Sequence, residues 1–182
     1  MFSHLDRFLH LRLSWALLAF ACAGLLGFGL YLQHVVGLEP CPMCIVQRYA
    51  MTLIGLLALL ALLTPHTRVQ QIWVVLTASL AGFGAFVAAR QSWLQWYPPN
   101  TVSCGRDFYG MIESFPLQRV IPLIFRGGGD CTQVDWTFLG GSIANWSFVA
   151  FVAMAAWLLL VVWRYVRIQS LATNQPLGDA ES

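Results

Sequence analysis

Four long apolar segments alternate with more polar stretches along this chain of 182 residues. They cover residues 15–32, 45–63, 72–89 and 146–163. Each is close to the roughly 20 residues that an α-helix needs to cross about 30 Å of hydrocarbon. Inside a bilayer the backbone must satisfy its own hydrogen bonds, so these segments should be helical. The pattern therefore predicts an all-α membrane protein with a bundle of four transmembrane helices.

The polar stretches divide the chain further. We expect one membrane domain over residues 1–170 and a polar cytoplasmic tail at 171–182. Two non-cytoplasmic loops join the helices, and the second, at 90–145, is long. Within it, apolar side chains at helical spacing predict a short helix on the membrane surface. These side chains are Leu117, Val120, Ile121 and Ile124.

The first apolar segment has two possible fates, removal as a secretory signal or retention as a helix. It is longer than the apolar core of a usual signal, and no clear Ala-x-Ala site precedes Gln33 and His34. We therefore expect it to remain as the first transmembrane helix.

Composition supports the membrane class. Hydrophobic residues make up 58% of the chain and charged residues 10%, which is far too apolar for a soluble domain of this size. The net charge is +2, and the positive side chains are arginines spread along the chain. Since they form no basic cluster, nothing indicates a nucleic-acid partner.

The arginines also predict the orientation. Loops with an excess of Lys and Arg stay in the cytoplasm. Arginines flank the two chain ends and the turn between the second and third segments, whereas residues 33–44 contain none. They are Arg7, Arg12, Arg68, Arg164 and Arg167. The long loop carries four arginines, which argues the other way, but the first helix usually sets orientation. We expect both termini in the cytoplasm and both cysteine-bearing loops outside it.

Four of the five cysteines lie in these outward loops, where disulfides can persist. Cys41 and Cys44 precede the second segment, and Cys104 and Cys131 lie in the long loop. Cys22 is in the middle of the first segment, which is typical of a small buried apolar side chain.

Cys41 and Cys44 form a Cys-x-x-Cys pair at the start of the second helix, with Pro40 before the pair and Pro42 within it. Two thiols at this spacing can open and close a disulfide readily. A cysteine in the first helical turn faces unpaired N–H groups, which favour a thiolate. Half of a zinc site is an alternative, but no second such pair follows, and we expect no metal. A purely structural disulfide is a further alternative, although so short a loop contributes little chain entropy.

Arg48 is the one charged residue within the four segments. A guanidinium at the centre of a span costs about 2.5–3.5 kcal/mol on insertion scales, and less near an end. It could extend to the membrane surface. It could instead stabilise the Cys44 thiolate, four residues before it on the same helix face, together with an anionic, oxygen-bearing small molecule in the bilayer.

Cys104 and Cys131 have flexible or extended flanks, proline-rich before Cys104 and glycine-rich before Cys131. A structural disulfide that closes the loop is one interpretation. The other is a redox-active disulfide that exchanges with the pair at Cys41 and Cys44. Such a relay would take electrons from a soluble dithiol and pass them to an apolar acceptor.

The chain resembles the disulfide bond formation protein B (DsbB) family, from about residue 11 to residue 167. The shared features are Pro40-Cys41-x-x-Cys44-x-x-x-Arg48, LQWYP at 94–98, Cys104, and GDCxxxxWxFLG at 129–140. Each piece alone is weak, but four spans with cysteines at these places form a specific combination.

The resemblance implies an activity, a location and a pairing. It implies an enzyme of the bacterial inner membrane that reoxidises a periplasmic thioredoxin-fold oxidase of the DsbA kind and reduces ubiquinone or menaquinone. It implies disulfides Cys41–Cys44 and Cys104–Cys131, with all four cysteines catalytic and Cys104 forming the mixed disulfide with the partner. It places the quinone beside Arg48.

The chain departs from the family pattern at two positions. Family members often have Glu just before the arginine and His near the end of the third span, where this chain has Gln47 and Gln91. Either glutamine can hydrogen-bond a quinone carbonyl, but neither can carry a proton as Glu or His can.

Two other functions fit parts of the sequence. A reductase of the vitamin K epoxide reductase type also has Cys-x-x-Cys at a helix end, but requires a different arrangement of the other cysteines. A non-enzymatic scaffold or transporter with structural disulfides would carry polar residues deep in several spans, and here Arg48 is joined only by scattered Ser, Thr and Gln.

Overall fold

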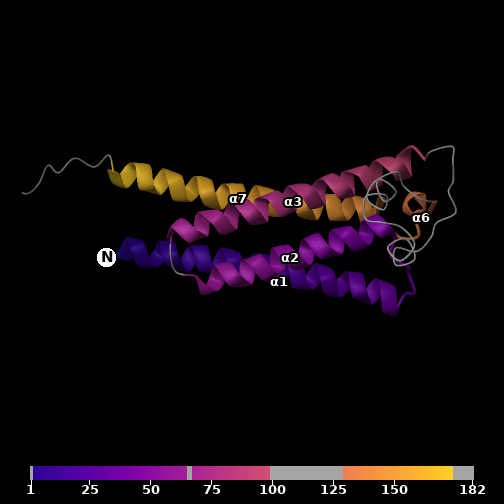
Figure 1. The fold of residues 1–182 in the computed structure, drawn as a ribbon, viewed down its shortest axis with the longest axis horizontal. Helices are drawn as coiled ribbons and strands as arrows, with labels where there is room; N and C mark the ends of the chain where they lie inside the picture. The colour runs from indigo at the N-terminus through magenta and orange to yellow at the C-terminus, as the bar shows by residue number, and fades with distance from the viewer. Residues whose placement is uncertain (1, 65–66, 99–128, 174–182) are drawn as a thin grey trace, which may run out of the picture.

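The computed structural model describes residues 2–64, 67–98 and 129–173 (Figure 1). Four long helices form an antiparallel bundle: α1 (Phe2–His34), α2 (Pro42–Leu63), α3 (Thr67–Trp96) and α7 (Ile143–Thr173). Each contains a stretch long and apolar enough to cross a membrane. The four-span, all-α architecture predicted from the sequence is thus confirmed. Cys104, the expected surface helix and residues 174–182 lie outside the described residues.

α1, α3 and α7 extend beyond the predicted apolar segments at both ends, and α2 extends at its start. α1 begins at Phe2 and ends at His34, and α3 continues to Trp96, into the region expected as a loop. α7 continues to Thr173, three residues into the expected tail. A hydrophobic run in the sequence marks only the part of a helix that lies in the hydrocarbon core of the membrane. The helix itself continues for as long as its backbone hydrogen bonds can form.

Between α3 and α7, the described residues contain one helical turn and a hairpin. The turn is α6 (Gly129–Thr132), and strands β1 (Thr137–Phe138) and β2 (Gly141–Ser142) pair antiparallel. Leu139 and Gly140 connect the strands with φ of 50° and 79°. Two successive positive φ values are typical of the tight turn that matches strand twist in a two-residue hairpin. The sequence analysis did not predict this hairpin.

The core of the bundle contains several alanines that let the helices approach closely, as is usual in membranes. They pack with larger buried side chains from α1, α2 and α7, among them Trp15, Ile54 and Phe151. Gly84 on α3 lies against the ring of Phe151 on α7, which is fully buried.

Polar side chains fasten the end of the bundle that holds the α2–α3 turn. The amide of Gln70 accepts from Trp15 Nε1 at 2.8 Å and donates to the carbonyl oxygens of Ala61 and Thr64 at 2.8 and 2.6 Å. Trp73 Nε1 donates to Thr64 Oγ1 at 3.0 Å. α1, α2 and α3 are therefore joined at this end, while α6 and the start of α2 lie at the other (Figure 1).

The Gly84 contact generates a prediction. A Cβ at Gly84 would lie 2.3 Å from Phe151 Cε1, so Gly84→Ala forces α3 and α7 apart. We expect the free energy of unfolding to fall by about 1–3 kcal/mol, measured in detergent by tryptophan fluorescence. Gly82→Ala is the control, because a Cβ there meets nothing within 4 Å and alanine favours helix. Equal loss of stability in both variants would contradict close α3–α7 packing.

Candidate functional site

The start of α2 is built around Cys41. This residue is the N-cap, with extended backbone angles, and Pro42 follows as the first helical residue. Proline suits that position because its missing N–H would have no helical partner. The Cys41 sulfur accepts the backbone N–H of Cys44 at 3.3 Å, as an oxygen does in an ordinary cap. Cys44 thus lies in the first turn, as the sequence predicted.

The two sulfur atoms lie together and share one donor. Cys41 Sγ and Cys44 Sγ are 2.8 Å apart. From α3, Gln91 Nε2 donates to Cys41 Sγ at 3.3 Å and to Cys44 Sγ at 3.2 Å. Gln47 Nε2 donates to Gln91 Oε1 at 2.7 Å, which orients the Gln91 amide with its N–H groups toward sulfur. Both glutamines are buried. Their hydrogen bonds therefore lie in a region of low dielectric constant, where such bonds are stronger than in water.

Cys131 from α6 reaches the same place. It is buried and packs in one cluster with Cys41, Met43, Val87 and Leu94. Hydrogen bonding to the thiols of Cys131 and Cys44, together with burial, raises the pKa of Cys41 well above its ordinary value. The fold thus brings three of the four predicted redox cysteines together, although Cys131 is 87 residues beyond Cys44 in the chain.

Arg48 binds α1. One guanidinium nitrogen donates to Gln33 Oε1, and Nη2 donates to the carbonyl oxygen of Gly29 at 3.0 Å. Gly29 and Gln33 are four residues apart, so both partners lie on one helical face. Arg48 is half-buried, and these two acceptors attach its guanidinium to α1. The sequence analysis missed Gln33, for which the only signal was a polar residue at the end of an apolar run.

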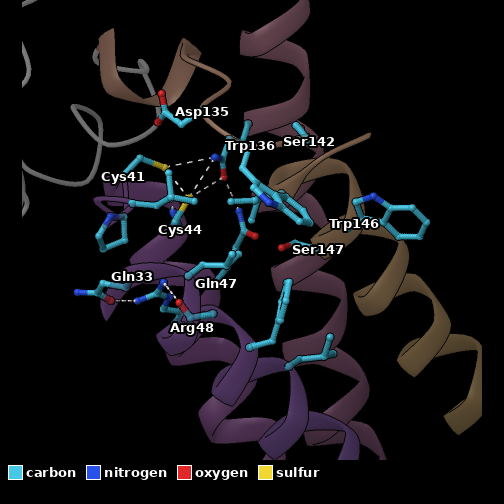
Figure 2. Close-up of a pocket in the computed structure, with 18 of the residues that line it drawn as sticks. Gln33, Cys41, Cys44, Gln47, Arg48, Asp135, Trp136, Ser142, Trp146 and Ser147 are labelled. Carbon is cyan, nitrogen blue, oxygen red and sulfur yellow. Dashed lines mark hydrogen bonds between the residues drawn. The ribbon is translucent and has the colours of Figure 1, made fainter. Parts of the chain in front are cut away.

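A cavity of about 540 Å³ lies beside these groups (Figure 2). Its volume is within the range of small-molecule sites. Side chains of Cys41, Cys44, Gln47, Arg48 and Gln91 line one part. Apolar side chains line most of the remainder: Leu25, Phe28, Leu32, Met51, Trp136, Phe138, Trp146 and Ala150. Figure 2 shows the cysteines and Arg48 on one side of the cavity, with Trp136 and Trp146 across from them.

The hairpin forms the wall opposite the cysteines. Ser142 Oγ donates to Gln95 Oε1 of α3 at 2.6 Å, and Trp146 Nε1 of α7 donates to the Phe138 carbonyl oxygen at 2.9 Å. Gly141 lies against this indole, where a Cβ would be 2.9 Å from Nε1. Sequence reasoning noted the WxFLG letters only as a family feature and did not predict that they line the site.

One end of this apolar cavity therefore contains the thiols of Cys41 and Cys44 at a helix N-terminus, the guanidinium of Arg48 and the amides of Gln47 and Gln91. The family model for disulfide bond formation protein DsbB matches residues 11–161. The chain belongs to the DsbB family. The sequence resemblance is thereby confirmed.

Several curated DsbB relatives are similar over most of their length. Disulfide bond formation protein B of Paracidovorax citrulli is 63% identical over 152 residues, covering 84% of this chain and 87% of the relative. The protein of that name from Polaromonas naphthalenivorans is 63% identical, covering 84% of this chain and 91% of its own. The one from Azoarcus is 53% identical, covering 78% and 84%.

The Gln91 amide generates the second prediction. Its N–H groups stabilise negative charge on the sulfur atoms, so Gln91→Leu should slow alkylation of the reduced pair at pH 7 by about tenfold. The rate is measured with iodoacetamide, reading Cys44 by peptide mass spectrometry. Ser92→Ala is the control, because Ser92 is also buried at this level of α3 but does not line the cavity. Equal rates in Gln91→Leu and wild type would contradict the assigned donor role.

Proposed function

We propose that this protein is a membrane thiol oxidase that generates disulfides for a partner outside the cytoplasm and passes the electrons to a quinone. One observation supports this most strongly. The Cys41–Cys44 pair lies at the end of a membrane span and opens onto an apolar cavity that also contains Arg48. A thiol pair so placed can serve one reactant in water and another in lipid. The name of the relatives, Disulfide bond formation protein B, agrees with the disulfide-forming half.

The relay begins at the outer pair, Cys104 and Cys131. A reduced partner dithiol attacks their disulfide, with Cys104 forming the mixed disulfide; the partner leaves oxidised, and the two thiols remain on this protein. These thiols then reduce the Cys41–Cys44 disulfide by exchange. The packing of Cys131 with Cys41 in one buried cluster supports exchange between the two pairs. Two electrons and two protons thus move from the partner to the inner pair.

The lining of the cavity supports a quinone as the electron acceptor. A quinone headgroup is a flat apolar ring with two carbonyl acceptors, and the chamber offers an apolar lining with donors at one end. Arg48 and Gln47 would hold the carbonyl oxygens, since a guanidinium has five N–H donors and Gln33 and Gly29 take only two of them. Bound there, ubiquinone or menaquinone would take up the two electrons and two protons released as the Cys41–Cys44 disulfide re-forms.

The residues around the cavity have separate roles in the proposed reaction. We assign Cys44 as the sulfur that reacts with the molecule in the cavity, because its side chain is half-buried, whereas Cys41 is buried and packs with Cys131. Cys41 keeps its proton in the reduced pair, since hydrogen bonding to Cys131 and Cys44 raises its pKa. Arg48 stabilises negative charge on sulfur and oxygen. Gln91 and Gln47 position groups by hydrogen bonding, and neither carries a proton.

The proposal includes location and sidedness. A DsbB chain with four spans is a multi-pass membrane protein, and we place it in the bacterial inner membrane. The arginines favour cytoplasmic termini. Because the start of α1 and the end of α7 lie at one end of the bundle and α6 lies at the other, the cysteines would then face the periplasm (Figure 1). The partner would be a periplasmic thioredoxin-fold oxidase of the DsbA kind.

The redox activity is tested with purified protein in detergent, a reduced thioredoxin-fold oxidase and ubiquinone, following loss of the absorbance of oxidised quinone. We expect consumption only with the dithiol partner present. Cys44→Ser should abolish it, and Arg48→Ala should slow it by about a hundredfold, because a donor to developing negative charge is typically worth that factor.

Cys22→Ala is the matched control, since Cys22 is buried between helices and does not line the cavity. It should retain wild-type turnover. If wild type and Cys44→Ser consume quinone equally, the enzymatic proposal fails and the cysteines are structural.

Sidedness is tested with alkaline phosphatase, which requires disulfides and is active only outside the cytoplasm. A fusion after Trp136 should be active and a fusion after Ser170 inactive. The reverse pattern would contradict the proposed orientation.

A further inference from the structure

Two glutamines one turn apart on α3 contact the two sides of the thiol cluster. Gln91 donates to the sulfur atoms of Cys41 and Cys44. Gln95 follows four residues later, and residues at this spacing lie on one face of a helix. Gln95 is half-buried and lines the same cavity, but its hydrogen bonds go to the chain that follows Cys131. One face of α3 thus contacts both the inner thiols and the segment attached to Cys131.

The amide of Gln95 is bonded through both its nitrogen and its oxygen. Nε2 donates to the backbone carbonyl oxygen of Gln133 at 3.4 Å, and Oε1 accepts from Ser142 Oγ at 2.6 Å. Ser142 Oγ in turn accepts the backbone N–H of Asn145 at 3.4 Å, in the first turn of α7. One side chain of α3 is therefore bonded to both ends of the segment 133–142, and through Ser142 to the start of α7.

Cys131 depends on such contacts for its position. It lies in α6, which is a single helical turn, and one turn of helix is not stable by itself. Its side chain is 1% exposed and packs in one cluster with Val87 and Leu94 of α3 and with Cys41. Apolar contacts of this kind are not directional. The hydrogen bond from Gln95 to the backbone two residues beyond Cys131 is directional, so it fixes the orientation of this part of the chain on α3.

Exchange between the two pairs requires that orientation. In the proposed relay, Cys104 is in the mixed disulfide with the partner when the Cys131 thiolate bonds to the Cys41 sulfur; the Cys41–Cys44 bond breaks, and Cys44 keeps the electron pair. The partner's second thiol then releases Cys104, which displaces Cys41 and re-forms the Cys104–Cys131 disulfide. Two electrons have moved to Cys41 and Cys44, which recover the two protons lost by the partner's thiols. Such an attack is fast only when the reacting atoms are aligned at about 3–3.5 Å.

We propose that Gln95 is a positioning residue for the exchange between the two disulfides: through its bonds to Gln133 and Ser142 it keeps Cys131 aligned with Cys41. The inference rests on the proposed function, because it concerns the transfer from the outer pair to the inner pair. Gln95 acts on Cys131 through the chain. It should therefore affect the transfer between the pairs, and neither the attack of the partner on the outer pair nor the reaction of the inner pair with quinone.

The test follows the two pairs separately in time. Quinone-free, fully oxidised protein in detergent is mixed with a reduced thioredoxin-fold oxidase, quenched with acid and alkylated, and mass spectrometry of the Cys131 and Cys44 peptides shows when each thiol appears. In Gln95→Leu we expect the Cys131 thiol to appear within about twofold of the wild-type rate and the Cys44 thiol to appear about tenfold more slowly. A species with a Cys131 thiol and an intact Cys41–Cys44 disulfide should therefore accumulate.

The inner pair is measured by itself in protein that also carries Cys104→Ser and Cys131→Ser, where dithiothreitol reduces Cys41–Cys44 directly and ubiquinone reoxidises it. Gln95→Leu should leave this rate within about twofold of that without the substitution. Gln95→Glu keeps the acceptor for Ser142 but loses the donor to Gln133, so its exchange rate should lie between those of wild type and Gln95→Leu. This variant also guards against misfolding of Gln95→Leu.

Gln71→Leu is the matched control, because Gln71 is an exposed glutamine near the other end of α3 that does not line the cavity. It should keep every rate at the wild-type value. Wild-type exchange in Gln95→Leu would overturn the positioning role, and so would equal slowing of the Cys131 and Cys44 thiols. Slower quinone reduction by the inner pair alone would make Gln95 a quinone contact, which also overturns it. Wild-type protein in which no Cys44 thiol appears would overturn the proposed relay itself.

Discussion

A guanidinium inside an apolar span must find its hydrogen-bond acceptors within the protein, and this requirement organises the site. Arg48 finds them on α1, in the Gly29 carbonyl and the Gln33 amide. Both acceptors are neutral, and within the part of the chain that the structure describes the arginine has no ion-pair partner, so its charge is not cancelled there. That charge stands beside the cavity that Cys44 also lines. The pairing also joins α1 to α2 at the cysteine end, as the Gln70 network joins them at the other end.

Neutral amides complete the polar part of the site. Gln47 orients Gln91, and Gln91 donates to both sulfur atoms. A carboxylate in place of Gln47 would add a negative charge close to sulfur, and a histidine in place of Gln91 could gain or lose a proton. With glutamine at both positions, neither residue adds a titratable group beside the thiols. The same feature requires that protons travel through other groups.

Much of the fold and part of the site could be predicted from the sequence. Four spans follow from hydrophobic length, because the bilayer leaves the backbone few choices. Cys41, Cys44 and Arg48 were found because a redox motif and an isolated charge are visible locally. Gln33 and Trp136 were not given roles, since each acquires its partner from a distant element. The packing of Cys131 on Cys41 likewise depends on how α6 packs against α3, which no local pattern encodes. The hairpin turn escaped prediction because Leu139 occupies a position where Asn or Gly is usual.

The cap at the start of α2 has a thermodynamic consequence. The sulfur of Cys41 both accepts the Cys44 N–H and exchanges electrons, so one atom belongs to the helix and to the redox couple. If the cap is stronger in one redox state, that difference adds directly to the reduction potential. An N-cap contributes about 0.5–2 kcal/mol, and about 1.4 kcal/mol corresponds to 30 mV for a two-electron couple. Substitutions that alter only the first turn of α2 can therefore tune the driving force of the relay without touching a cysteine.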